Sequence, residues 1–200
     1  MSELLFNELP RPTFRWLRVN HTVSSLAGED TAVQSIAVEA NKDILSPLPV
    51  GTALLDGNYE GANKEAVHVL VEKAEGYAIN VPPKAKEVVG IRIDANARVA
   101  NRFQFIVGEG AELEVQFYVT GSGDALTNVS YLNEYDVKEA GKVVVKKVNL
   151  LPEHVQHIEH RYTKLEEKAD VEYINIEIGG SENILNYYHD LVGQESRMVH

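Results

Sequence analysis

The 200-residue chain contains no cysteine. Without thiols it can form no disulfide and no thiolate zinc site, it cannot hold a metal cluster through cysteine ligands, and it has no cysteine nucleophile. Any thiol chemistry in which the protein takes part must therefore come from another subunit.

The chain also lacks long apolar runs and an excess of positive charge. No run approaches the roughly 18 apolar residues of a membrane-spanning helix, and the N-terminal MSELLFNELP has neither the basic start nor the apolar stretch of a signal peptide. Lys and Arg number 19 against 30 Asp and Glu, and the net charge of -11 should repel nucleic acid and anionic lipid. We therefore expect a cytoplasmic protein that binds neither nucleic acid nor membrane.

Signatures of common enzyme sites are missing as well. The sequence has no Gly-x-Ser-x-Gly elbow for a hydrolase nucleophile. Two glycine-bearing stretches, 107–110 and 179–181, lack the Lys-Ser/Thr ending of a P-loop and the spacing of a dinucleotide fingerprint. We interpret both stretches as turns.

The sequence does contain a regular series of short β-branched runs. Turn-forming residues such as Pro82-Pro83, Gly108 to Gly110 and Ala140-Gly141 separate them. The runs occupy residues 66–71, 77–81, 88–93, 103–107, 113–119, 129–135, 143–148 and 171–178. This rhythm predicts an all-β protein, and it suits a sandwich, a barrel or a solenoid. The stretch 107–115, a strand, a tight glycine corner and a second strand, favours a solenoid, although no fixed repeat of 20 to 50 residues is present.

One segment departs from the strand rhythm. Apolar residues at positions 155, 158, 162, 165 and 169 follow helical spacing, and Pro152 suits a first helical turn. The spacing predicts a helix over 153–168. The family resemblance described below favours extended structure in the same segment.

Three histidines lie within seven residues of that segment: His154, His157 and His160. Imidazole is a common ligand of zinc, iron and copper, so these residues are a candidate metal site. On a helix only two of them would converge, and on a strand His157 would point away from the other two. A metal site would need a further ligand, such as Glu153, Glu159 or a second chain. The alternative interpretation is three solvated polar side chains.

Several segments together resemble the core domain of the SufB/SufD family over about residues 65 to 195. They are 77–82 (YAINVP), 90–93 (GIRI), 105–115 (FIVGEGAELEV), 169–180 and 184–193 (ILNYYHDLVG). The resemblance implies a right-handed parallel β-helix at 65–200 after a short irregular N-terminal segment at 1–64. In that fold, Ile91, Ile93, Phe105, Val107, Leu113 and Val115 should point into one core.

The resemblance also implies a function. Members of this family are scaffold subunits on which iron–sulfur clusters are assembled, together with a SufC-like ABC-type ATPase and a SufB/SufD-type paralogue or a second copy. The chain would then be no enzyme, and a cluster would be held only in the assembled complex. The absence of cysteine makes it closer to SufD than to SufB. The family pattern continues beyond Leu191-Val-Gly193, so we expect a fragment or a short member that lacks the C-terminal part, and no cluster ligand carries over to this chain.

Two other functions remain open from the residues alone. One is a structural β-solenoid that self-associates through the exposed edges of its end coils. The other is a metal-dependent enzyme that uses His154, His157 and His160.

Overall fold

A computed structural model describes residues 4–6, 22–24, 36–55, 59, 64–96, 98–122 and 127–200 of the chain. Its elements are β1 (Leu4–Phe6), β2 (Thr22–Ser24), β3 (Ile36–Glu39), β4 (Leu45–Leu48), α1 (Lys64–Lys73), β5 (Gly76–Val81), β6 (Lys86–Asp94), β7 (Val99–Val107), β8 (Glu112–Thr120), β9 (Thr127–Val137), β10 (Lys142–Leu150), β11 (Val155–Leu165), β12 (Asp170–Glu177), β13 (Glu182–Leu191) and β14 (Arg197–Val199).

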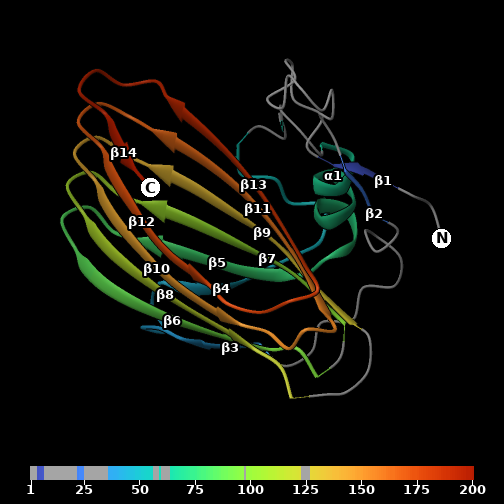
Figure 1. The fold of residues 1–200 in the computed structure, drawn as a ribbon. Coiled ribbons are helices and arrows are strands. Elements are labelled where there is room, and N and C mark those ends of the chain that lie inside the picture. Colours follow the sequence, from blue (N-terminus) through green and yellow to red (C-terminus); the bar gives the residue numbers. More distant parts are fainter. Residues whose placement is uncertain are drawn as a thin grey trace.

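The strands from β5 onward wind into a solenoid of stacked parallel coils (Figure 1). Successive strands alternate between two six-stranded sheets. Sheet I has the order β14-β12-β10-β8-β6-β3, and sheet II has the order β13-β11-β9-β7-β5-β4. The predicted all-β parallel β-helix is therefore confirmed.

Each strand pairs in parallel with the strand one coil further along the chain. The first residues of four sheet I strands lie in one row, in which Lys86, Glu112, Lys142 and Asp170 are successive partners. These partners are 26, 30 and 28 residues apart. Because the length of a coil varies, the sequence shows no fixed period although the structure repeats.

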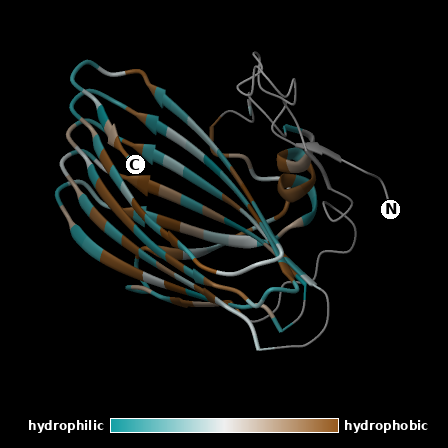
Figure 2. Ribbon diagram, in the orientation of Figure 1, coloured by the Kyte–Doolittle hydropathy of each residue, from teal (hydrophilic) through white to brown (hydrophobic). Residues whose placement is uncertain are grey.

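The core lies between the two sheets. Side chains alternate between the lumen and the outside along strands such as β6 and β8, as the change of hydropathy along the ribbons shows (Figure 2). The six residues predicted to share one core are all buried to 2% exposure or less and belong to one apolar cluster. Aromatic rings stack inside it, with the centroids of Phe105 and Tyr135 4.6 Å apart.

The corners that follow the sheet II strands stack in register too. Each corner places one residue in the left-handed region, with φ between 53° and 63°: Lys84, Gly110, Ala140, Lys168 and Glu195. The amide of each such residue up to Lys168 donates a hydrogen bond of 2.8 to 2.9 Å to a carbonyl of the next corner. A column of hydrogen-bonded corners therefore runs along this side of the solenoid.

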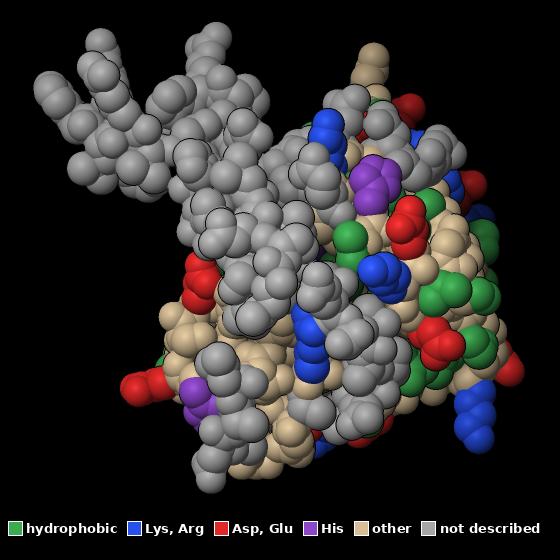
Figure 3. All heavy atoms as spheres, turned by 90° about the vertical axis from the view of Figure 1, so that its right-hand side faces the viewer, with side chains coloured by type: hydrophobic (Ala, Val, Ile, Leu, Met, Phe, Trp, Pro, Cys, Tyr) green, Lys and Arg blue, Asp and Glu red, His purple; other side chains and the backbone are tan. Residues whose placement is uncertain are grey.

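Helix α1 packs on the outer face of sheet II. Val67, Leu70 and Val71 are buried against Leu132 and Tyr162 of that face. The strand predicted at 66–71 was wrong, because its apolar residues recur at the helical spacing that buries one face of α1. Figure 3 shows this side of the molecule, on which the described acidic, basic and apolar side chains are intermingled.

The helix predicted at 153–168 was also wrong, and extended structure is confirmed there as β11. Every residue of β11 except Lys164 is buried, because one face lines the lumen and the other faces the side on which α1 packs. A strand buried on both faces shows no alternation of apolar and polar residues. The spacing of the apolar residues of β11 happened to match that of an amphipathic helix.

Two of the strands that precede α1, β3 and β4, extend the large sheets by antiparallel pairing, whereas β1 and β2 form a separate two-stranded sheet. β3 pairs with β6, and β4 pairs with β5. The division of the chain after residue 64 stays a prediction. Within the described residues, no helix has the length and apolar character needed to cross a lipid bilayer.

Candidate functional site

The lumen of the solenoid changes from apolar to polar along its length. Inward side chains stack in columns because the strands pair in register. Two columns of sheet I show the change: Ile91, Phe117, Lys147 and Asn175 form one, and Ile93, Val119, Asn149 and Glu177 form the other. The later coils therefore enclose polar side chains where the earlier coils enclose apolar ones.

Glu159 of β11 is the centre of a buried charge network. It has no exposed surface, and its carboxylate forms an ion pair with Lys147 of β10. The same carboxylate accepts hydrogen bonds from Arg161 Nη2 at 2.6 Å and from Asn133 Nδ2 at 3.0 Å. Lys147 also forms an ion pair with Glu177. Two cations and two carboxylates thus neutralise one another inside the lumen.

His157 connects this charge network to amide side chains. Its Nε2 lies 3.1 Å from the hydroxyl of Tyr131, and its Nδ1 lies 3.1 Å from Asn149 Nδ2. Asn149 in turn donates a hydrogen bond of 2.8 Å to Glu177. A continuous set of hydrogen bonds therefore joins both sheets across the lumen.

Arg161 lies between two tyrosine rings at the end of this network. Its guanidinium carbon is 4.1 Å from the ring centroid of Tyr173 and 4.2 Å from that of Tyr187. This geometry is a cation–π sandwich. The rings of His189 and His200 flank it, with centroids 5.4 Å from Tyr173 and 4.9 Å from Tyr187, respectively.

The network fixes the charge of its members. Burial would raise the pKa of Glu159, but the charges of Arg161 and Lys147 outweigh burial and hold that pKa well below its usual range. Burial and the charge of Lys147 lower the pKa of His157 to about 4. At neutral pH, Glu159 is therefore ionised and His157 is neutral. The charges of the site balance one another, so it gives no net attraction for a free ion.

The structure separates the three histidines of the candidate metal site. His154 lies in the corner before β11, His157 points into the lumen, and His160 lies on the opposite face of β11 beside Asn186. In the described part of the chain, no three His, Cys, Asp or Glu side chains are grouped so that they could hold a metal ion. A metal site at these histidines stays a prediction.

A comparison with protein families identifies residues 91–200. They match the family model described as "SUF system FeS cluster assembly, SufBD core domain", which covers more than half of the chain and the whole lumen network. The chain belongs to the SufB/SufD family. No curated protein and no solved structure matches it. Membership supports a role for this SufB/SufD-type chain in SUF iron–sulfur cluster assembly.

The lumen network itself was missed from the sequence of this SufB/SufD chain: among its members, His157 and Glu159 were named, and only as candidate metal ligands. One signal was present. The inward-facing residues of β10 are Val143, Val145, Lys147 and Asn149. Two polar residues therefore occupy positions that alternate in step with the buried valines and point into the lumen. A lysine at an inward-facing strand position predicts a buried carboxylate that neutralises it. Only the fold reveals that this carboxylate is Glu159.

Proposed function

We propose that this chain is a scaffold subunit of the SUF iron–sulfur cluster assembly machinery. It acts in the cytoplasm, in a complex with a SufC-like ABC-type ATPase and a SufB/SufD-type partner, either a paralogue or a second copy. The family match over residues 91–200 is the observation that carries this proposal.

The residues of the chain favour a scaffold over an enzyme. With no cysteine, the chain supplies no thiolate to a cluster, so the cysteine ligands of the cargo come from a partner. The charged groups of the lumen are already paired with one another, and His157 is held neutral among amides and a tyrosine. Hydrolysis of ATP and thiolate ligation therefore belong to the partner subunits.

Affinity co-purification from the native cell tests the proposal. The tagged chain should recover an ABC-type ATPase at a stoichiometric level, as scored by mass spectrometry. An unrelated tagged protein of similar size and net charge is the control for binding through acidic surface alone. An intact, folded chain that recovers no such ATPase would contradict the proposal.

A further inference from the structure

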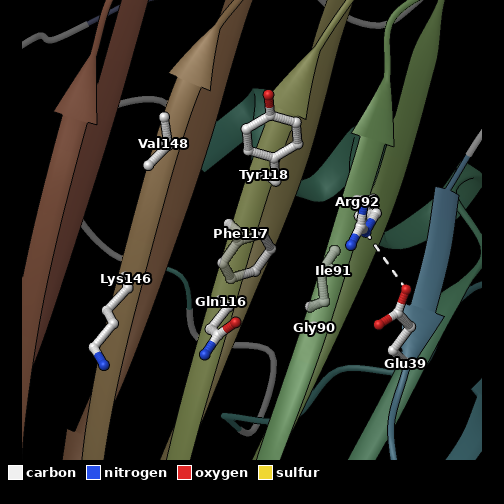
Figure 4. A pocket seen from close by; sticks show the side chains of 9 residues that line it. All are labelled: Glu39, Gly90, Ile91, Arg92, Gln116, Phe117, Tyr118, Lys146 and Val148. Atoms are coloured by element: carbon white, nitrogen blue, oxygen red, sulfur yellow. Dashed lines mark ion pairs between the residues drawn. The ribbon is translucent and has the colours of Figure 1, made fainter.

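A coil that runs in the reverse direction covers the first coil of the solenoid. Its strands β3 and β4 pair antiparallel with β6 and β5, whereas the other strand pairs of the two large sheets are parallel. On the outer face, Glu39 of β3 forms an ion pair of 3.4 Å with Arg92 of β6 (Figure 4). The apolar side chains that this reversed coil packs against the core are Ile36, Val38, Ala40, Ile44 and Leu45. Among the described residues, no strand lies beyond β3 or β4 in either sheet.

The register of β4 shows which of its backbone groups face the open edge of sheet II. The amide of Asn80 donates a hydrogen bond of 2.8 Å to the carbonyl of Ile44, so these two residues form a hydrogen-bonded pair of the β4–β5 ladder. Hydrogen-bonded and non-hydrogen-bonded pairs alternate along an antiparallel ladder. Ser46 and Leu48 therefore bond to β5 as well, and the amides of residues 45, 47 and 49 point away from β5.

Two of these three outward-facing residues are prolines, Pro47 and Pro49. Proline has no backbone N–H, and within sheets it is found at edges, where the missing donor breaks no ladder bond. Only Leu45 of the three residues keeps a donor for a further strand. The carbonyl of Pro49 is occupied as well, because it accepts a hydrogen bond of 2.7 Å from Nη2 of the buried Arg102. The edge of β4 therefore lacks most of the groups that a further strand would need.

We propose that Pro47 and Pro49 close this end of the solenoid to strand addition. An open edge pairs readily with any extended chain, and short edge strands and prolines are the features that prevent such pairing. β4 is four residues long and has both features. Neither an extended peptide nor another copy of the chain can then continue sheet II beyond β4, so growth into an array through this end is blocked. The device lies outside residues 91–200, which match the family, and it does not rest on the proposed function.

Restoring the missing donors tests the proposal. The double substitution Pro47→Thr and Pro49→Thr returns two N–H groups to the edge and leaves the carbonyl of residue 49 for Arg102. In light scattering at rising protein concentration, the unsubstituted chain should keep a discrete mass, and the mean mass of the double variant should at least double. Pro83→Thr is the matched control, because Pro83 is an exposed proline in the corner between β5 and β6, and it should behave as the unsubstituted chain. Circular dichroism establishes folding, and Pro47→Thr alone, which restores one donor, should also associate if the double variant does not fold.

Amide hydrogen exchange locates the contact in the associated variant. The restored amides of residues 47 and 49 should exchange more slowly at high protein concentration than at low concentration, because a second strand then holds them in hydrogen bonds. A folded double variant that keeps a discrete mass would overturn the proposal, and so would association in which both amides still exchange freely. Growth of the unsubstituted chain with concentration, or equal association of Pro83→Thr, would overturn it too. Recovery of an ATPase enters none of these outcomes, so this proposal and the assembly role can fail separately.

Discussion

Glu159 is the residue on which the buried charges of the lumen depend. Its carboxylate lies between Lys147 and Arg161, and none of the three side chains reaches solvent. Glu159→Gln removes the negative charge and leaves two buried cations with Glu177 alone. Breaking a buried ion pair in this way costs about 3–5 kcal/mol. We expect a loss of that size in the free energy of unfolding, measured by urea denaturation at pH 7.

The exposed carboxylate Glu172, on the outer face of β12, provides the matched control. Glu172→Gln should change the free energy of unfolding by less than about 0.5 kcal/mol, as surface substitutions usually do. Equal effects of the two substitutions would show that the lumen charges do not interact as their distances indicate.

Two fully buried histidines should make stability depend on pH. Burial, together with the charge of Lys147 for His157, lowers the pKa of His157 and of His160 to about 4 from 6.5. Between these values the unfolded chain binds more protons than the folded chain, so the free energy of unfolding falls as pH falls. The expected slope is up to about 1.4 kcal/mol per pH unit for each histidine. Glu159, whose pKa is lowered, contributes stability that is lost only as the pH falls below its ordinary pKa of 4.5, so its contribution changes little between pH 7 and pH 5.

Unfolding at pH 7 and pH 5 measures this dependence. His160→Gln should reduce the loss between the two pH values by about 2 kcal/mol relative to the unsubstituted chain. His68→Gln, at an exposed position of α1, should leave the loss unchanged. An identical loss in all three proteins would mean that His160 takes up its proton without unfolding.

At the scale of elements, the stacked corners have a conformational cost that glycine relieves. Ala140 has a φ of 53° at the position where the neighbouring corner has Gly110. A residue with a Cβ is strained in this region, so Ala140→Gly should stabilise the fold by about 0.5–1 kcal/mol. Gly179→Ala should do the reverse, because φ is 87° there and a Cβ would lie 2.0 Å from the carbonyl oxygen of Leu151. Thermal melting of the two variants should therefore shift in opposite directions.

The strands of the solenoid were predictable from the sequence where one face is buried and the other is exposed to solvent. Segments such as 88–93 and 113–119 alternate as β6 and β8 do, and Gly108 to Gly110 marks the corner between β7 and β8. The two misread elements share a physical cause. Both α1 and β11 are buried against a neighbouring element, so their apolar positions reflect that contact. Short apolar runs fit a helix and a strand equally well, so the sequence alone did not distinguish the two.

At the scale of the whole molecule, the candidate site was the least predictable feature. Lys147, Glu159 and Arg161 lie at inward positions of two strands, and the spacing of His154, His157 and His160 drew attention to residues that point in different directions. Which columns meet across the lumen depends on the register of every coil, and that register follows from coil lengths that vary between 26 and 30 residues. Local sequence carries no such information.

We propose that this SufB/SufD chain supports cluster assembly and leaves the cysteine ligands to its partners. Iron and acid-labile sulfide, measured per chain in the purified chain alone and in its complex with the ATPase and a cysteine-bearing partner, test it most directly. After anaerobic incubation with iron and sulfide, we expect stoichiometric iron and sulfide in the complex and none in the chain alone. A stable cluster on the isolated chain, or none in the intact complex, would contradict it.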